Sequence, residues 1–401
     1  MTHIAVIGAG QAGASLVAKL RALGSKADIS LIGAETVPPY QRPPLSKAYL
    51  LGEIPAERLF LRPEEFYEQN RIALHLGEEV TAIDPAGRSL ALKSGDKISY
   101  DALVLTTGSS PRRLPEAIGG NLPGCFTLRN LADVEAMRPA MVPGKHAVIV
   151  GGGYIGLEGA AVARKLGMKV TLVEMAPRIL QRVAAPETSD YFRALHRAQG
   201  VTILEGTGLA RLTGTDHVTG AVLSTGQEIA ADLVIVGVGI TPNTRLAEQA
   251  GLIIDNGIAV DDLGRSSDPN IWAAGDCASF PWQGGWLRLE SVQNAIDMAE
   301  NIAANLTGAA KPYIPLPWFW SDQYDVKLQI AGLGTGHDRI VTRQGGRATS
   351  FWYYAGDRLL AVDAMNDPRA FMVSKRLIER GQSADPALVA DPDSDLRALL
   401  S

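Results

Sequence analysis

The feature that most constrains this chain of 401 residues is a glycine-rich pattern that occurs twice. The first copy, HIAVIGAGQAGASLVAKLRALGSKADISLIGAE, covers 3–35, and the second, HAVIVGGGYIGLEGAAVARKLGMKVTLVE, covers 146–174. Each copy opens with a short apolar run rich in β-branched residues, which is typical of a strand buried on both faces. A GxGxxG turn, an apolar helical stripe and a second strand ending at an acid follow in each. This is the full context of a dinucleotide-binding motif, so the sequence predicts two such sites.

The three glycines of each copy have separate tasks in this prediction. In order, they allow a tight turn, a close approach of the backbone to a pyrophosphate, and close packing of helix on strand. They are Gly8, Gly10 and Gly13 in the first copy, and Gly151, Gly153 and Gly156 in the second. The field of an exposed helix N-terminus contributes only ~0.3–1 kcal/mol, so two phosphate charges need further Arg or Lys donors. The bland alternative is a pair of α/β repeats that have lost their ligands.

Each copy ends at an acid, Glu35 or Glu174. A carboxylate at this place accepts a hydrogen bond from a ribose 2′-hydroxyl and repels a 2′-phosphate. The second site is therefore predicted to prefer NADH over NADPH, with Arg178 as a nearby charge that opposes this preference.

Later strands that end in glycine close each glycine unit, in YDALVLTTGSSPR and in ADLVIVGVGITPN. The segment NIWAAGDCASF then indicates a return to the first domain, so the second domain is inserted into it. From residue 313 on, alternating segments such as RATSFWYYAG predict antiparallel strands, and AFMVSKRLIERG predicts a helix. We predict an α/β protein with two Rossmann-like domains and a small C-terminal α+β domain, whose acidic tail is expected to be frayed. The domains are 1–109 with 240–312, then 110–239, and finally 313–401.

Composition excludes several classes of protein. The formal charge of −5 argues against a general nucleic-acid binder. Cys125 and Cys277 lie far apart and in no CxxC spacing, which favours reduced thiols and a cytoplasmic location. No apolar run approaches the ~20 residues of a membrane span, and no export signal is expected. The six histidines show no ligand spacing, so no metal site is predicted.

The order of motifs along the chain carries a family resemblance. GAGQAG, PPYQRPPLSKAYL, TTGSSPR, GGGYIGLE, TLVE, AAGDCA and PWFWSDQYD follow one another. This order resembles the NADH-dependent, FAD-containing ferredoxin reductases of the putidaredoxin-reductase-like type, which serve haem-thiolate monooxygenases or Rieske dioxygenases. The resemblance covers nearly the whole chain, and RPPLSK and PWFWSDQY are more specific than the glycine loops. It implies a glutathione-reductase-like flavoprotein fold with FAD as permanent cofactor at the first site and NADH as substrate at the second.

The resemblance also implies roles for individual residues. Those expected to bind FAD are Gly8, Gly10, Ala12, Gly13, Glu35, Arg42, Lys47, Val80, Arg129, Asp276, Val292 and Trp320. Those expected to bind the nicotinamide nucleotide are Gly151, Gly153, Tyr154, Ile155, Gly156, Glu158 and Glu174. Lys47 is placed beside the flavin ring, and Glu158, placed at the carboxamide, is expected to pair with it; these two are the catalytic candidates.

Simpler interpretations stand beside these roles. Ser46 of RPPLSK could only cap a helix, and Asp276 could only cap the segment that follows it. Trp318 and Trp320 could be plain core residues, and Lys47–Glu158 a structural ion pair.

By resemblance, NADH passes a hydride to FAD, and single electrons leave to a small acidic 2Fe–2S ferredoxin. Val37–Leu51 contains no cysteine, unlike the corresponding stretch of disulfide reductases and peroxidases, so the acceptor is expected to be external. Basic candidates for ferredoxin docking are Arg288, Lys327, Arg339, Lys375 and Arg376. The alternatives are a rubredoxin reductase, a monodehydroascorbate-type reductase, and an apoptosis-factor-like protein that binds FAD and NADH with slow turnover. A monomer is expected.

Overall fold

The apolar runs that precede the two glycine turns form the central strands of two parallel sheets in this computed structural model, which describes residues 2–400. The chain divides into two units. Unit 1 consists of Met1–Gln41, Ala56–Ser110 and Thr241–Pro317, and unit 2 of Arg42–Pro55, Pro111–Ile240 and Trp318–Ser401. The chain passes between the units within β8 (Ser109–Pro111) and β17 (Ile240–Pro242), among other places.

The parallel sheet of unit 1 has the strand order β19-β7-β1-β2-β3. Its strands are β1 (His3–Ile7), β2 (Asp28–Gly33), β3 (Ile72–Leu76), β7 (Ala102–Leu105) and β19 (Ile271–Ala273). Strands β2 and β3 lie on one side of β1, and β7 and β19 on the other, so the order reverses beside β1. In open α/β sheets, ligands bind at the carboxyl ends of the strands at such a reversal, which here is where the first glycine turn begins.

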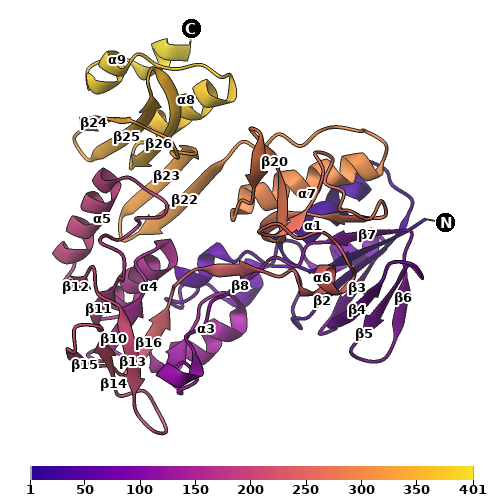
Figure 1. Cartoon of the computed structure of the whole chain (residues 1–401), viewed down its shortest axis with the longest axis horizontal. Coiled ribbons are helices and arrows are strands. Elements are labelled where there is room, and N and C mark those ends of the chain that lie inside the picture. Colours follow the sequence, from indigo (N-terminus) through magenta and orange to yellow (C-terminus); the bar gives the residue numbers. More distant parts are fainter. Residues whose placement is uncertain (1, 401) are drawn as a thin grey trace. The chain divides into compact units, whose positions relative to one another are not determined.

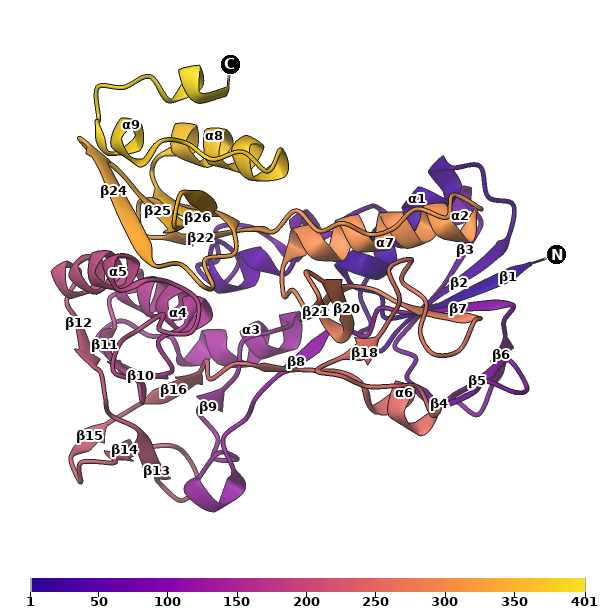
Figure 2. The same cartoon turned by 45° about the horizontal axis from the view of Figure 1, so that its top comes forward.

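Helices and two small sheets, one antiparallel and one mixed, complete unit 1. The helices are α1 (Gln11–Ala22), α2 (Glu64–Gln69), α6 (Arg245–Gln249) and α7 (Val292–Leu306). Two three-stranded sheets add β4 (Val80–Asp84), β5 (Ser89–Leu92) and β6 (Lys97–Ser99), and β18 (Ile258–Ala259), β20 (Ala278–Trp282) and β21 (Gly285–Leu287). Helices α1 and α7 lie side by side although they are far apart in the sequence (Figure 2).

Unit 2 contains a second parallel sheet of the same design, with the order β12-β11-β10-β16-β9. Its strands are β9 (Cys125–Phe126), β10 (His146–Val150), β11 (Lys169–Val173), β12 (Val201–Leu204) and β16 (Leu233–Val236). Its helices are α3 (Leu131–Met137), α4 (Tyr154–Lys165) and α5 (Pro186–Ala198), and β13 (Leu209–Thr213), β14 (Gly220–Leu223) and β15 (Glu228–Ala230) form a small antiparallel sheet. The reversal again lies beside the central strand, and the predicted α/β class is confirmed.

The C-terminal part of unit 2 is a five-stranded antiparallel sheet of order β22-β23-β26-β25-β24 with two helices (Figure 1). Its elements are β22 (Trp318–Gln323), β23 (Val326–Gly332), β24 (Arg339–Gly345), β25 (Ala348–Ala355), β26 (Arg358–Met365), α8 (Pro368–Glu379) and α9 (Pro386–Ala390). The antiparallel strands and the helix expected after residue 313 are therefore present.

The expectation of a frayed acidic tail is wrong. Leu396 is 1% exposed and belongs to the apolar core of the C-terminal sheet. The guanidinium of Arg343 donates to the carbonyls of Pro392 at 2.9 Å and Ser394 at 2.8 Å. These contacts between segments far apart in the sequence fix the tail, and its composition gave no sign of them.

Candidate functional site

In the first glycine loop, protein atoms pack closely against the first and last glycines, whereas the middle glycine faces open space. A Cβ atom on Gly8 would lie 2.2 Å from the carbonyl oxygen of Thr106, and a Cβ on Gly13 would lie 2.2 Å from that of Gly8. A Cβ on Gly10 would have no atom within 4 Å. The Thr106 hydroxyl donates to the Gly8 carbonyl at 2.8 Å and so holds the turn, in which Gly8 has a φ of +113°.

The second loop repeats this arrangement with different residues. A Cβ on Gly151 would lie 2.4 Å from the carbonyl oxygen of Gly237, and a Cβ on Gly156 would lie 2.0 Å from that of Gly151. Gly153 again faces open space, because a Cβ added there would have no atom within 4 Å. In both loops the open glycine directly precedes a helix whose first N–H groups have no partner in the helix, which is the geometry of a phosphate site. The residues present therefore fit two bound dinucleotides.

The two motif acids lie next to these loops but have different partners. Glu35 accepts a hydrogen bond from the Tyr40 hydroxyl at 2.6 Å. Glu174 accepts from the N–H of Gly152 at 2.6 Å with one oxygen and from the N–H of Ala176 at 2.7 Å with the other. The second carboxylate is thus fixed against its glycine loop, and each of its oxygens retains a further lone pair for a ribose hydroxyl.

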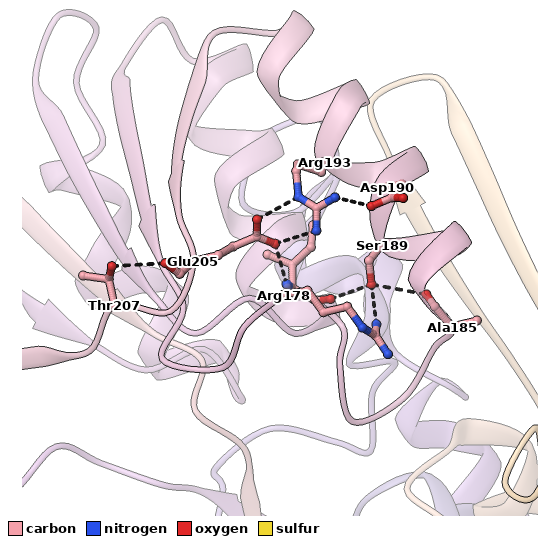
Figure 3. A network of polar contacts seen from close by, with 8 residues as sticks. Arg178, Ala185, Ser189, Asp190, Arg193, Glu205 and Thr207 are labelled. Atoms are coloured by element: carbon pink, nitrogen blue, oxygen red, sulfur yellow. Dashed lines mark hydrogen bonds and ion pairs between the residues drawn. The ribbon is translucent and has the colours of Figure 1, made fainter.

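Arg178, the charge that was expected to oppose the NADH preference, is tied to helix α5. Its guanidinium donates to the Ser189 hydroxyl at 2.5 Å (Figure 3). The neighbouring Ile179 N–H donates to Glu205 at 2.8 Å, and Glu205 in turn forms a two-pronged ion pair with Arg193 at 2.7 and 2.9 Å. These hydrogen bonds, chiefly those from Arg193, hold the pKa of Glu205 below its usual value although burial opposes them. The segment after Glu174 is therefore rigidly attached to α5 and to the end of β12.

The remaining FAD candidates of unit 1 lie at the ends of elements. Ala12 is buried in the first turn of α1, Val80 is the buried first residue of β4, and Val292 is the first residue of α7. Asp276 accepts a hydrogen bond from the Ser109 hydroxyl at 2.7 Å. Asp276 lies inside the 3-10 turn Gly275–Cys277, and the N-terminus of α7 is capped by Ser291.

In unit 2, the structure brings two FAD candidates together, because Arg42 donates to the Arg129 carbonyl at 2.9 Å. Trp320 stacks on Trp318 with ring centroids 5.4 Å apart. Trp318 also contacts Phe371 at 6.0 Å and packs against the C-terminal core, so the core interpretation holds for Trp318.

Lys47 and Glu158 form the expected ion pair, with 2.7 Å between Nζ and Oε2. The Glu158 side chain is only 3% exposed, and that of Lys47 is 19% exposed. Two hydroxyls also donate to this carboxylate, those of Ser46 and of Ser321, the latter at 2.6 Å. Ser46 ends the 3-10 turn Pro43–Ser46 and caps no helix, so the capping interpretation is wrong.

Tyr154 and Ile155 begin helix α4 directly after the open glycine. The Tyr154 ring stacks on Phe319 at 4.8 Å, while its hydroxyl is buried without a hydrogen-bond partner among the described residues. Burial raises the pKa of this hydroxyl well above its usual value. Ile155 is 42% exposed.

Residues 2–400 contain no disulfide, no cluster of metal ligands and no membrane-spanning helix. Cys125 and Cys277 are both free, and no three acidic, histidine or cysteine side chains in this range are placed to hold a metal ion. None of the helices described is both long and apolar enough to cross a membrane.

Residues that the motifs did not indicate support the site from a distance in sequence. These are Thr106 and Gly237 behind the two glycine turns, and Ser321 at Glu158. Thr106 and Gly237 each directly follow an apolar strand, which is a usable signal. Ser321 belongs to the motif PWFWSDQYD, from which only the tryptophans received an interpretation.

Comparison with known proteins places this geometry in a family. The pyridine nucleotide-disulphide oxidoreductase family matches residues 2–299, and the reductase C-terminal family matches 318–400. The chain belongs to the pyridine nucleotide-disulphide oxidoreductases. Members use FAD and NAD(P)H, so this chain is an FAD-containing, NAD(P)H-dependent oxidoreductase, as predicted.

Full-length relatives identify the branch of the family. Putidaredoxin reductase of Pseudomonas putida is 42% identical over 408 positions, covering all of this chain and 97% of the relative. Rhodocoxin reductase of Rhodococcus erythropolis is 42% identical, covering 99% and 94%. The reductase in the crystal structure of the covalent putidaredoxin reductase–putidaredoxin complex superposes with a TM-score of 0.96 at 42% identity, covering 100% and 98%. The predicted resemblance to ferredoxin reductases is thereby confirmed.

Proposed function

We propose that this chain is an NADH-dependent reductase that delivers single electrons to a 2Fe–2S ferredoxin serving an oxygenase. One observation carries the proposal: two glycine loops of the same design, each open only at its middle glycine, occur in a chain whose two cysteines are free. Two dinucleotides without a protein disulfide fit a reductase whose electrons leave to an external acceptor. The partner named for the structurally similar reductase is the iron–sulfur protein putidaredoxin.

Bound FAD supplies the chemistry, because it accepts two electrons as a hydride and releases them one at a time. The protein holds and orients the groups around it. The open loops offer backbone N–H groups to the two pyrophosphates, and Arg129 offers additional positive charge at the first of them. Lys47, fixed by Glu158, holds a positive charge for the flavin ring, and Glu158 orients the nicotinamide carboxamide.

The individual assignments remain those that the motifs predict. For FAD we propose Gly8, Gly10, Ala12, Gly13, Glu35, Arg42, Lys47, Val80, Arg129, Asp276, Val292 and Trp320. For the nicotinamide nucleotide we propose Gly151, Gly153, Tyr154, Ile155, Gly156, Glu158 and Glu174.

We propose that the second site prefers NADH over NADPH because Glu174 is locked in place. A 2′-phosphate about 5 Å from this carboxylate would be disfavoured by roughly 3 kcal/mol per unit charge at an effective dielectric near 20. The opposing charge of Arg178 is engaged by Ser189. We therefore expect kcat/KM to be at least ~100-fold higher for NADH, and Glu174→Ala to narrow that ratio. Equal efficiencies for the two nucleotides in the unmodified protein would contradict the proposal.

The role of Lys47 can be tested separately. A unit charge ~4 Å from a developing negative charge contributes ~4 kcal/mol at an effective dielectric near 20. Lys47→Ala should therefore slow reduction by NADH and lower the flavin potential. If neither quantity changes, the ion pair with Glu158 is only structural.

Docking of an acidic ferredoxin requires a basic surface. Arg288 drops out of the candidates, because its side chain is 10% exposed and already pairs with Glu290 at 2.7 Å. Lys327 and Arg376 are exposed on the C-terminal sheet and α8 and remain the better candidates, whereas Lys375 pairs with Glu379 at 2.6 Å. Reduction of the ferredoxin should slow as ionic strength rises.

The experiment that tests the function is an anaerobic titration of the purified protein with NADH, followed in the visible spectrum. A yellow protein that bleaches near one equivalent supports hydride transfer between the two sites. Screening of a 2Fe–2S ferredoxin, a rubredoxin and the monodehydroascorbate radical then identifies the acceptor. A protein that NADH cannot bleach would favour the slow FAD- and NADH-binding alternative.

We further propose the predicted three-domain division, at 1–109 with 240–312, 110–239 and 313–401. A cytoplasmic location agrees with two unpaired thiols. The predicted monomer is to be tested by light scattering.

A further inference from the structure

The motif PWFWSDQYD contains polar residues for which the proposed function gives no task. Ser321, Gln323 and Tyr324 follow Trp320 on and after β22. Ser321 and Gln323 are completely buried, and so is His196 on helix α5, which contacts Gln323. Buried polar side chains are costly unless each one is hydrogen-bonded, so their partners show what they do.

These side chains form one unbroken chain that ends at Glu158. The Ser321 hydroxyl lies 2.6 Å from Glu158 Oε1, and Gln323 Nε2 lies 3.2 Å from Ser321 Oγ. His196 Nε2 lies 2.8 Å from Gln323 Oε1, and the Tyr324 hydroxyl lies 3.3 Å from His196 Nδ1. All five residues belong to unit 2, where α4 packs against β22.

The carboxylate dictates the direction of every hydrogen bond in the chain. A carboxylate only accepts, so the single hydroxyl proton of Ser321 must point at Glu158. Ser321 Oγ must then accept from its other neighbour, which requires the NH₂ group of Gln323 on that side. The Gln323 carbonyl therefore faces His196 and requires a proton on Nε2. His196 Nδ1 is left as an acceptor for the Tyr324 hydroxyl.

The Tyr324 hydroxyl donates to Nδ1 only when the His196 ring is neutral. Burial lowers the pKa of His196 to about 4, against a weaker opposing effect of its bond to Gln323. The ring is therefore uncharged at neutral pH, and its tautomer is determined by its two hydrogen bonds.

We propose that Ser321, Gln323 and His196 are positioning residues that hold the Glu158 carboxylate in place for the nicotinamide. This inference rests on the proposed function. Lys47 and Ser46 hold one oxygen of the carboxylate, and Ser321 holds the other, so the carboxylate can neither rotate nor tilt. The C-terminal sheet thus takes part in the hydride step as well as in any contact with an electron acceptor.

The first test measures no activity. Nitrogen-15 NMR of protein labelled in histidine, with His196→Gln to assign the signal, reports which ring nitrogen carries the proton. We expect the neutral Nε2–H tautomer at pH 7, and loss of that strict preference in Gln323→Leu. An Nδ1–H tautomer at pH 7 would overturn the proposal, because Nε2 could then not donate to the Gln323 carbonyl and the chain could not run toward Glu158.

The second test measures the rate constant for flavin reduction by NADH in stopped flow. Ser321→Ala should lower it roughly tenfold, as expected for a lost hydrogen bond to a charged group. Gln323→Leu, which removes the bond to Ser321, should lower it by no more than that. Ser321→Thr retains the hydroxyl and should restore most of the rate. Ser350→Ala is the matched control, because it removes another completely buried hydroxyl from the same sheet, one bonded to Trp352 and Asp367 instead.

The rate constants of double variants show whether a substitution acts by releasing Glu158 or by destabilising the protein. If Gln323 acts through Ser321, the double variant should be no slower than Ser321→Ala alone. In the Glu158→Gln variant, the additional substitution Ser321→Ala should lower the rate constant of flavin reduction only slightly further.

The outcomes distinguish this inference from the function on which it rests. If NADH reduces the unmodified protein but Ser321→Ala behaves like Ser350→Ala, only the positioning proposal fails. If Glu158→Gln reduces at the unmodified rate, the role of Glu158 fails and the positioning proposal with it. If NADH does not reduce the unmodified protein at all, the proposed function itself fails.

Discussion

The second glycine loop allows stability and nucleotide binding to be separated with two substitutions of the same kind. In Gly156→Ala the new methyl carbon would lie 2.0 Å from the Gly151 carbonyl oxygen, whereas in Gly153→Ala it would meet nothing within 4 Å. Gly153 has φ −80° and ψ 179°, a conformation that alanine adopts freely. The two variants add the same atom three residues apart, to a packed and to an open position.

The magnitudes follow from these contacts. An ordinary C···O contact is ~3.3 Å or more, so Gly156→Ala must move backbone by more than ~1 Å. Overpacking of this kind costs ~3 kcal/mol, and the better helix propensity of alanine returns ~1 kcal/mol, which leaves a net loss of ~2 kcal/mol. Gly153→Ala stands at the N-cap of α4 and should change the free energy of unfolding by less than ~1 kcal/mol. Its methyl group would occupy the space proposed for the pyrophosphate, so NADH binding should weaken by roughly tenfold or more.

The assay combines urea denaturation, followed by circular dichroism, with the NADH concentration dependence of flavin reduction. Bound FAD is the internal control, because neither substitution touches the first glycine loop. Unchanged stability in Gly156→Ala would refute the packing argument. NADH binding as tight as in the unmodified protein would show that the space at Gly153 is not the pyrophosphate site.

Further predictions concern buried charges in unit 2. Burial raises the pKa of Asp363 to about 6, so the contribution of Asp363 to the free energy of unfolding should fall as pH rises from about 4 to 6. Burial lowers the pKa of His196 to about 4, so the contribution of His196 to the free energy of unfolding should increase as pH rises from about 4 to 6.5. The two contributions change in opposite directions, by up to roughly 3 kcal/mol each over the whole titration. The Asp363→Asn variant should therefore gain stability with rising pH and the His196→Gln variant should lose it, as measured by urea denaturation at pH 4.5 to 7. Parallel profiles for both variants would contradict these assignments. Arg193→Met should destabilise the protein by roughly 1–3 kcal/mol because it leaves the half-buried Glu205 without its ion pair, whereas Asp190→Ala, at a residue 69% exposed, should change stability by less than ~0.5 kcal/mol. Equal losses of stability in these two variants would show that the Arg193–Glu205 ion pair stabilises the protein no more than the exposed Arg193–Asp190 pair.

Much of the fold could be predicted from the sequence because its signals are local. The strand before Gly8, the turn and helix α1 follow one another within about twenty residues, and each is specified by its own periodicity or by a glycine. The same holds for the second copy at Gly151. Part of the small C-terminal sheet was also predictable, since residues 326–329 of β23 alternate between apolar and polar.

The tail shows where local signals mislead. The sequence DPDSDLRALL is acidic and short, which favours a frayed end. Arg343, about fifty residues away, supplies the hydrogen bonds that order it. No pattern in the tail itself indicates that partner.

The sequence by itself determined that this chain has two dinucleotide-binding loops and which acid accompanies each. Those features depend on backbone conformation and on short-range spacing, which the residue types dictate directly. Only the tertiary structure decided that Ser46 and Ser321 join Lys47 at Glu158, and that a buried histidine completes the chain behind it. A buried polar side chain must find a partner, but which partner it finds depends on how distant elements pack, and that choice is not written near the residue in the sequence.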